Sequence, residues 1–244
     1  MPDVTPRVGI IVVNYNSAAF IDEFCASLKA IDYPAWRLIV VDSGSSDGSM
    51  TAIESSFAGC ADFKAVRCPD NIGFAAGANL PFDGGLLDGC EFVLFLNNDT
   101  VLTRDFLTRM VESADEKMIV VPKILYTDDH RLISTHAGGF DWRLGVFRHT
   151  FAGRTDGPAT SVRRDDLATA SFCCALVPVQ AFRDAASANR SGGGGSRSRA
   201  RRGLVAGRAR AAGDSQDGAA KPAGAHGRSR RARAARLGDG TRAR

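Results

Sequence analysis

Short apolar runs alternate with segments of helical spacing over the first half of this 244-residue sequence. Continuous apolar runs occupy 8–13, 38–41 and 92–96, and residues 63–68 alternate between apolar and polar positions. Continuous runs of this length predict strands that are buried on both faces, and the alternating run predicts a further strand. Alternation of strands with helices predicts an α/β fold with an open, mostly parallel sheet and helices on both faces.

Apolar residues three or four positions apart predict the helices between these strands. The segments are 18–30, a helix from Asp47 through Phe57, a helix at 73–80 and a helix at 103–114. Ser17 and Asp47 are suited to cap helix N-termini, whereas Pro81 and Gly84-Gly85 are expected to interrupt the third helix. A further strand is expected at 118–121. After residue 122, short strands and loops bearing Gly and Asp indicate that the sheet changes character.

Three of the predicted strands end in polar clusters. The clusters are Asn14-Tyr15-Asn16, residues 42–47 with the sequence D-S-G-S-S-D, and Asn97-Asn98-Asp99. If the strands are parallel, all three clusters lie along one edge of the sheet. Ligands of open α/β sheets bind beyond the carboxyl ends of the strands, so this convergence is the main functional signal in the chain.

Two carboxylates in these clusters point to a phosphorylated ligand and a cation. The sequence contains neither G-x-G-x-x-G nor G-x-x-x-x-G-K-[ST], which argues against the common dinucleotide and P-loop sites. Asp42 can accept hydrogen bonds from a base N–H or from ribose hydroxyls. Asp99 is an oxygen ligand suited to Mg²⁺ or Mn²⁺, and a cation bridging it to a diphosphate would offset the charge repulsion.

Two of these clusters, and the segment 71–79, also have a purely structural interpretation. Asp47 and its loop are typical of a helix cap, and Asn98-Asp99-Thr100 is typical of a polar turn between a strand and a helix. Residues 71–79 carry small side chains around Gly73 and Gly77, so their backbone can approach either a ligand or another helix or sheet closely.

The composition divides the chain after about residue 184. Residues 185–244 carry a net charge of +12, hold 42 Ala, Gly or Arg among 60 residues and contain no aromatic residue. Such a segment cannot bury enough apolar area to offset its chain entropy, so we expect a disordered basic tail. Residues 1–184 carry a net charge of −8 and all 19 aromatic residues, and we expect them to form the folded domain.

The six cysteines form no C-x-x-C pair and no spacing typical of a zinc site. Buried thiols in a reducing cytosol are the simplest interpretation. We expect no signal peptide, because the first apolar run is short, and no transmembrane segment, because no apolar run approaches the ~18 residues that a spanning helix needs.

Several motifs occur together and in a fixed order. They read V-V-N-Y-N-S at 12–17, V-D-S-G-S-S-D-G-S at 41–49, N-I-G-F-A-A-G-A-N at 71–79 and F-L-N-N-D-T at 95–100. This set resembles family 2 glycosyltransferases of the GT-A fold, and V-V-P-K-I-L-Y at 120–126 and A-G-G-F-D-W-R-L-G at 137–145 are similar to their rhamnosyltransferase-like branch. The resemblance covers roughly residues 7–183.

The resemblance implies an inverting transfer of a sugar, with rhamnose suggested by the branch, from a dTDP- or UDP-sugar. Tyr15 would pack against the base and Asp42 would hydrogen-bond it. The remaining donor cradle would consist of small and amide residues: Asn71, Gly73, Gly77 and Asn79. Asn97 and Asp99 fall on the first and last positions of the D-x-D metal motif, so a neutral amide replaces one carboxylate and Asp99 would be the principal ligand of Mg²⁺ or Mn²⁺.

The resemblance further implies a saccharide or lipid-linked acceptor and a role in making cell-surface polysaccharide. The expected location is cytoplasmic, with peripheral contact at the inner face of the membrane. An inverting transfer needs a general base, which the family supplies from an E-D motif. No such motif follows Asp184, and no Glu follows Glu116. We therefore expect a truncated domain whose tail is an out-of-frame translation of a GC-rich gene.

Two other functions are compatible with the sequence. One is a nucleotide-sugar binder without turnover, which loss of the general base would produce. The other is non-specific binding of polyanions by the +12 tail. The tail lacks the aromatic residues of a stacking platform, so we expect no specific nucleic-acid partner.

Overall fold

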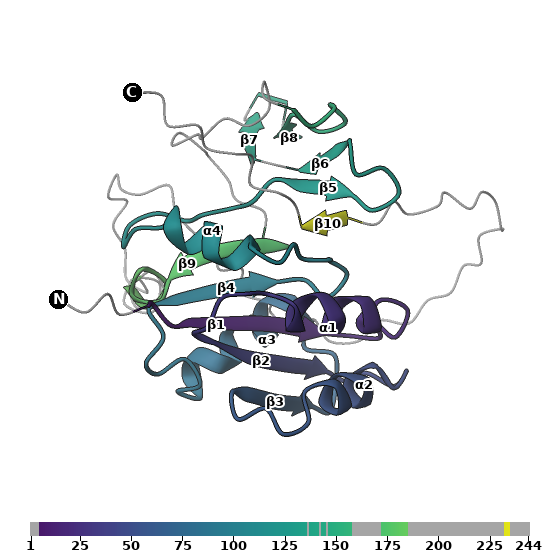
Figure 1. Ribbon diagram of the computed structural model, residues 1–244, viewed down its shortest axis with the longest axis vertical. Coiled ribbons are helices and arrows are strands. Elements are labelled where there is room, and N and C mark those ends of the chain that lie inside the picture. The colour runs from purple at the N-terminus through teal and green to yellow at the C-terminus, as the bar shows by residue number, and fades with distance from the viewer. Residues whose placement is uncertain are drawn as a thin grey trace.

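The computed structural model describes residues 5–135, 137–141, 143–144, 146–157, 172–184 and 232–234. At its centre is a five-stranded sheet with the order β3-β2-β1-β4-β9 (Figure 1). Its strands are β1 (Val8–Asn14), β2 (Trp36–Ser43), β3 (Phe63–Cys68), β4 (Phe92–Leu96) and β9 (Cys174–Pro178). Strands β1 to β4 are parallel and β9 is antiparallel to β4, which confirms the predicted mostly parallel sheet.

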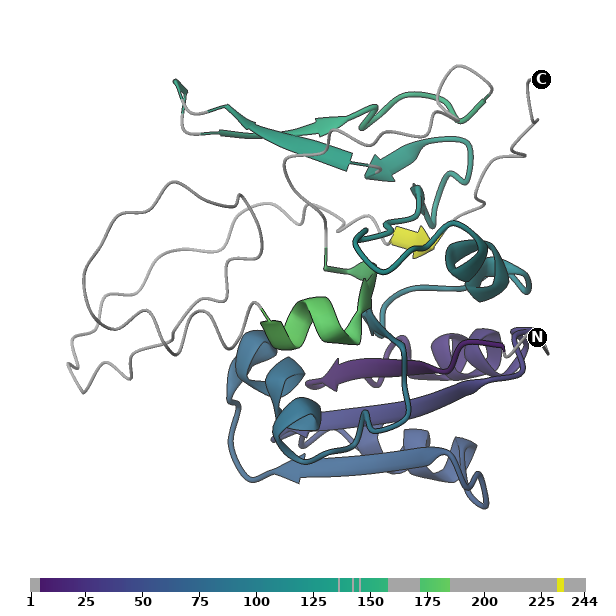
Figure 2. The same ribbon diagram turned by 90° about the vertical axis from the view of Figure 1, so that its left-hand side faces the viewer.

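Helices cover both faces of this sheet, as predicted. Helices α1 (Ile21–Lys29), α2 (Ser49–Ser56) and α4 (Phe106–Glu112) pack on one face, and α3 (Gly73–Asp83) packs on the other (Figure 1). Residues 179–184 are also helical and lie beside α3, where the rings of Phe82 and Phe182 stack with centroids 4.1 Å apart (Figure 2).

Alternation along the central strands explains these two layers. In β1, Ile10 belongs to the apolar cluster under α1, α2 and α4, whereas Ile11 belongs to the cluster under α3. The same division separates Leu38 from Ile39 in β2. Successive strand residues point to opposite faces, so continuous apolar runs supply both halves of the core.

The sheet changes character after residue 122, as the sequence indicated. Strands β5 (Ile124–Tyr126) and β6 (Ile133–Thr135) pair antiparallel, and β7 (Ala137–Asp141) pairs with β8 (Val146–Thr150) as an antiparallel ribbon. Figure 2 shows these strands beyond the β9 side of the central sheet. The short segment β10 (Ala232–Ala234) pairs with β5. Apart from β10, the predicted disordered tail lies outside the described residues, so that expectation stays a prediction.

Three local expectations were wrong. Residues 118–121 form no strand, because only Val120 makes a bridge, to Leu176 of β9. Ser17 does not cap α1, whose N-cap position is Phe20, because its hydroxyl donates to Asn14 instead. Pro81 does not interrupt α3, which continues to Asp83 and ends at Gly84, the second of the expected interruptions. A proline so close to the end of a helix removes only one backbone hydrogen bond before the helix stops.

Candidate functional site

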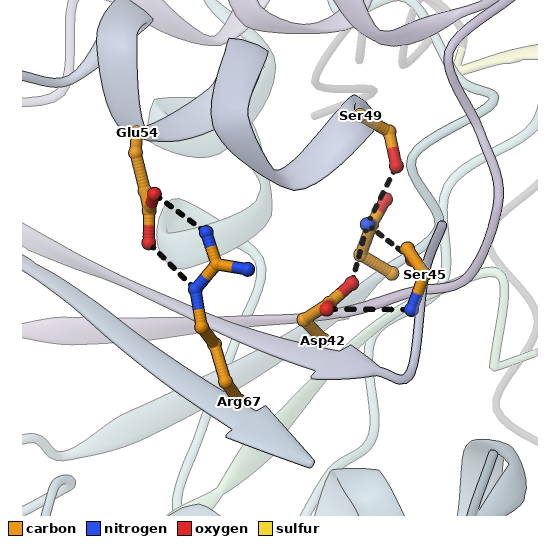
Figure 3. A network of polar contacts seen from close by, with 6 residues as sticks. Asp42, Ser45, Ser49, Glu54 and Arg67 are labelled. Atoms are coloured by element: carbon orange, nitrogen blue, oxygen red, sulfur yellow. Dashed lines mark hydrogen bonds and ion pairs between the residues drawn. The ribbon is translucent and has the colours of Figure 1, made fainter. Parts of the chain in front are cut away.

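The polar clusters meet at the edge where β1 to β4 end, which we call the carboxyl edge. Asn14, the last residue of β1, is fully buried and is the register partner of Asp42 on β2. Its side-chain Nδ2 donates to Asp42 Oδ1 at 2.9 Å, to Ser45 Oγ at 3.0 Å and to Ser49 Oγ at 3.0 Å. Figure 3 shows Asp42, Ser45 and Ser49 gathered near the end of β2.

The other end of the same amide holds the loop that follows β4. Asn14 Oδ1 accepts hydrogen bonds from Asn98 Nδ2 at 2.7 Å and from the Ser17 hydroxyl. Asn98 Nδ2 also lies 2.9 Å from Ser17 Oγ. The side chains of Asn14, Ser17, Asp42, Ser45, Ser49 and Asn98, which we call the Asn14 network, therefore join all three sequence clusters, as the parallel sheet predicted.

Asp42 lies at the end of β2, next to the Asn14 amide. Its side chain is 3% exposed, and Oδ2 accepts only a long bond of 3.4 Å from the Ser45 backbone N–H. A carboxylate has about four acceptor positions, so lone pairs remain for an N–H or O–H group of a ligand. A hydrogen bond from Asp42 to a base or to ribose stays a prediction.

Arg67 lies opposite Asp42 on β3 but is engaged elsewhere. Its guanidinium donates to both carboxylate oxygens of Glu54, at 3.2 and 2.7 Å (Figure 3). The bonds to Glu54 raise the pKa of Arg67, with a smaller contribution of the same sign from Asp42. Arg67 thus places a permanent positive charge beside the candidate site while its fork is occupied by Glu54.

Asp47 has the structural role that the sequence offered as an alternative. It does not occupy the N-cap position of α2, which is Gly48, but its Oδ1 accepts from the Ser49 backbone N–H at 3.0 Å. Its Oδ2 accepts from the Ala18 N–H at 2.7 Å, which ties the loop after β1 to the loop after β2. The hydrogen bond from the Ser49 side chain, followed by that from Ala18, lowers the pKa of Asp47.

Asn71 attaches the loop after β3 to the end of β2. Its Oδ1 accepts from Ser43 Oγ at 3.1 Å and from the Gly73 N–H at 2.9 Å, and Ser43 Oγ accepts from the Ile72 N–H at 2.8 Å. Gly73 has a φ of +75° and open space where a side chain would stand. Its backbone is therefore accessible at the carboxyl edge, as a donor cradle requires.

The other two predicted cradle residues have different surroundings. A Cβ on Gly77 would lie 3.0 Å from Val13 Cγ1, so the small residue here permits close contact of α3 with the sheet. Asn79 is exposed, and its Nδ2 donates to the Ala75 carbonyl oxygen one turn earlier in α3. The interpretation of close helix–sheet packing holds for Gly77, and a ligand role for either residue stays a prediction.

Asn97 and Asp99 stand at the end of β4 and offer oxygen ligands only. Asp99 is exposed and Asn97 is half-buried, with its backbone N–H donating to the Cys173 carbonyl oxygen at 2.9 Å. Among the described residues, no group of three or more His, Cys, Asp or Glu side chains could hold a metal by itself. One exposed carboxylate beside an amide oxygen fits Mg²⁺ or Mn²⁺ bound mainly by water and ligand phosphates.

Aromatic side chains are exposed at this same edge. Tyr15, which follows β1, is 49% exposed, and Phe74, in the first turn of α3, is 41% exposed. Exposed rings beside polar groups are suited to pack against a flat ligand. Sequence reasoning assigned Tyr15 a role but missed Phe74, which stood within the recognised motif at 71–79.

Sequence reasoning also missed the central place of Asn14 and Asn98. Asn14 follows Ile10 and Val12 at a spacing of two, so it occupies an inward-facing position of β1. A polar residue in that phase has to find hydrogen-bond partners inside the protein. That signal was available in the sequence, although it did not identify the partners.

The comparisons with known proteins agree with this architecture. Residues 9–185 match the family model described as glycosyl transferase family 2. The solved structure of Staphylococcus aureus TarS 1–349 shares 20% identity, with 74% of this chain and 49% of that chain covered and a TM-score of 0.50. The same protein in complex with UDP-GlcNAc gives 20% identity, coverage of 74% and 47%, and a TM-score of 0.50. These matches confirm the predicted GT-A fold.

A mannosyltransferase from Pyrobaculum calidifontis, solved in complex with GDP-Man and Mn²⁺, is 28% identical over 51% of this chain and 36% of that chain, with a TM-score of 0.42. The comparison with curated proteins gave no match. The chain thus spans between about a third and a half of the length of these solved structures. Across the ranges that the structure describes, no helix combines the length and apolar character needed to cross a membrane.

Proposed function

Because the chain belongs to glycosyl transferase family 2, we propose that it binds a nucleoside diphosphate sugar at the carboxyl edge and transfers the sugar to a saccharide or lipid-linked acceptor. The observation that carries this proposal is the Asn14 network, which joins the loops after β1, β2 and β4 into one surface. Asp42, a member of this network, lies at the end of β2, and Asp99 follows Asn98 in the loop after β4.

In this proposal the nucleoside binds over the ends of β1 and β2. Asp42 accepts a hydrogen bond from the base, and Tyr15 packs against the base with its exposed ring. Asn71 and the open backbone of Gly73 contact the donor from the loop after β3, with Gly77 and Asn79 further along α3. The family resemblance favours a dTDP- or UDP-sugar, with rhamnose as the sugar of the similar branch.

The diphosphate then lies toward the loop after β4. Asp99 and Asn97 would hold Mg²⁺ or Mn²⁺ there, and the exposed carboxylate of Asp99 is the stronger ligand of the two. When bound, such a cation neutralises the charge that develops on the departing diphosphate.

The acceptor and the reaction stereochemistry rest on the family resemblance alone. An inverting transfer requires a general base on the acceptor hydroxyl, and no E-D motif that could supply one follows Asp184 in the sequence. The expected cytoplasmic location, peripheral contact with the membrane and role in cell-surface polysaccharide are likewise part of this proposal.

A panel of nucleoside diphosphates tests the proposal directly. UDP, dTDP and GDP are titrated by calorimetry against the full chain, each in EDTA and in excess Mn²⁺, followed by their sugar conjugates. We expect selective binding of at least one nucleotide, tightened by Mn²⁺. The matched control is Asp88→Ala, which removes an exposed carboxylate in the turn before β4, at the opposite edge of the sheet. Absence of binding by every nucleotide in both conditions would refute the proposal.

A further inference from the structure

The side-chain amide of Asn14 uses all of its hydrogen-bonding capacity. Its two N–H groups face three acceptors within 3.0 Å, and its oxygen accepts from two donors. An amide offers two donors and two lone pairs, so no position is left over. Because the residue is fully buried, each of these groups would be costly to leave without a partner.

The orientation of this amide is fixed by its neighbours. A carboxylate only accepts hydrogen bonds, so the Asp42 side requires the nitrogen of Asn14. The Asn98 side presents an N–H donor and therefore requires the oxygen. A carboxylate or an apolar side chain of similar size at position 14 cannot serve both sides, because the first has no donor and the second has neither donor nor acceptor.

Asn98 lies between Asn97 and Asp99 in the sequence. The hydrogen bonds from its side chain to Asn14 and Ser17 therefore restrict the positions of both neighbours. The Thr100 hydroxyl reinforces this loop by donating to the Asn97 carbonyl oxygen at 2.7 Å. At the other end of the network, Asp42 is held by Asn14 at 2.9 Å and more loosely by Ser45. One buried side chain thus contacts both Asp42 and the loop that carries Asp99.

We propose that Asn14 is a positioning residue that fixes the nucleoside-reading carboxylate and the cation-holding loop in one geometry. This inference rests on the proposed function, because it takes Asp42 to read the nucleoside and Asp99 to hold the cation. The two halves of the site then bind one rigid ligand at a fixed separation. Preorganised groups bind more tightly because less conformational freedom is lost on binding.

Two substitutions break the two sides of the network separately. Asn14→Asp keeps the size of the side chain and an acceptor for Asn98 and Ser17, but replaces the donor to Asp42 with a repelling carboxylate. Asn98→Ala releases the loop after β4 and leaves the Asn14–Asp42 bond intact. The nucleotide that binds best in the panel is titrated against both variants, in EDTA and in Mn²⁺.

We expect Asn14→Asp to weaken binding in EDTA about tenfold, as loss of a bond to a charged group does, with the tightening by Mn²⁺ largely kept. We expect Asn98→Ala to leave binding in EDTA within about twofold but to reduce the tightening by Mn²⁺ about tenfold, as loss of support behind a metal ligand does. A general loss of folding would reduce both the binding in EDTA and its tightening by Mn²⁺ in both variants. A different effect of each variant therefore identifies a positioning role.

Gln180→Glu is the matched control. The Gln180 amide also donates to a carboxylate, Asp184 Oδ1 at 2.7 Å, but it is exposed and follows the end of β9 that pairs with Phe92, far from the carboxyl edge. This change should leave binding in EDTA and its tightening by Mn²⁺ unaltered.

A double variant tests the mechanism further. In EDTA, Asp42→Ala should weaken nucleotide binding little further when Asn14→Asp is already present. The reason is that Asn14→Asp has already displaced the carboxylate that Asp42→Ala removes.

The outcomes distinguish this inference from the proposed function. If the unaltered chain binds no nucleotide, the proposed function fails first. Two outcomes would show that the positioning role of Asn14 is wrong while the proposed function stands, provided that the unaltered chain binds with Mn²⁺ dependence. In the first, Asn14→Asp and Asn98→Ala both behave like Gln180→Glu. In the second, both variants lose binding in EDTA and its tightening by Mn²⁺ together, with a fall in melting temperature.

Discussion

The Asn14 side chain donates to the Asp42 carboxylate at 2.9 Å across two adjacent parallel strands on which these residues are register partners. Both residues are buried. Asn14 is the last residue of β1, and Asp42 is the residue before the last of β2. The pair therefore anchors the loops that follow β1 and β2 to the rigid sheet. A site built on strand ends keeps its geometry better than one carried by loops alone.

Asp42 and Asp99 should contribute to nucleotide binding in different ways. Asp42→Ala should weaken binding about tenfold in EDTA and leave the tightening by Mn²⁺ unchanged, because it removes one hydrogen bond to the nucleoside. Asp99→Ala should leave binding in EDTA unchanged and abolish the tightening by Mn²⁺. Calorimetric titration of UDP or dTDP in both conditions measures the two effects. Equal losses for both variants in EDTA would contradict the assignment of roles.

Gly44 should be required for the contact between the loops after β2 and β3. Its φ is +74°, and a Cβ would stand 2.8 Å from the Asp70 carbonyl carbon. Gly44→Ala should destabilise the fold by about 1–3 kcal/mol, since backbone strain and a steric clash act together. Gly59→Ala is the matched control, because Gly59 has a φ of +77° with open space around it.

Thermal unfolding followed by circular dichroism compares the two glycine variants. The fall in melting temperature should be clearly larger for Gly44→Ala than for Gly59→Ala. The difference isolates the clash with the Asp70 backbone from the cost of the left-handed conformation, which both variants share. Equal falls would mean that the loop after β3 moves away freely.

The sequence predicted the central sheet well because local pattern and tertiary structure agree there. The strand predicted at 63–68 coincides with β3, and the helices that follow each parallel strand were all found. The prediction at 118–121 was wrong because β9 comes from residues 174–178 and takes the place beside β4. No local pattern records that a distant segment occupies a position in the sheet.

The site was predictable to a similar extent. Parallel strands bring their ends to one edge whatever the details, so the convergence of the three clusters followed from the fold class. The pairing of Asn14 with Asn98 did not, because it joins residues 84 positions apart through side chains. The position of Gly77 against Val13 likewise depends on how closely α3 approaches the sheet, which composition alone leaves open.

Asp47 should make a pH-dependent contribution to stability. Its pKa in the folded protein is lowered from 3.8, chiefly by the Ser49 side chain and the Ala18 N–H. A lowered folded-state pKa means that the stabilisation is present above the unfolded value of about 4 and is lost as the pH falls through the folded-state value. Asp47→Asn should therefore melt earlier than the unaltered chain at about pH 7, and this difference should shrink as the pH falls below about 4.

The measurement is a series of thermal melts of both chains between these pH values. Asp22→Asn, on the exposed first turn of α1, is a control for loss of one negative charge. A difference in melting temperature that stays constant with pH would mean that the Asp47 hydrogen bonds do not depend on its charge.

The exposed rings at the carboxyl edge should bind the nucleoside without stabilising the fold. Tyr15 and Phe74 are 49% and 41% exposed, so truncating either ring removes little core. If the base packs on Tyr15, Tyr15→Ala should weaken nucleotide binding by about 1–3 kcal/mol, the usual worth of stacking on one ring. Phe74→Ala tests whether the first turn of α3 supplies a second apolar contact, and its loss should be smaller, about twofold to fivefold.

Leu144→Ala provides the matched control for both changes. Leu144 is 63% exposed and belongs to the turn between β7 and β8, outside the carboxyl edge. All three variants should melt within a few degrees of the unaltered chain, since exposed side chains contribute little to stability. Only Tyr15→Ala and Phe74→Ala should lose affinity, and they should lose it for the nucleoside as well as for the diphosphate, because a stacked base does not need the phosphates. Unchanged nucleoside affinity in Tyr15→Ala would place the base elsewhere on the edge.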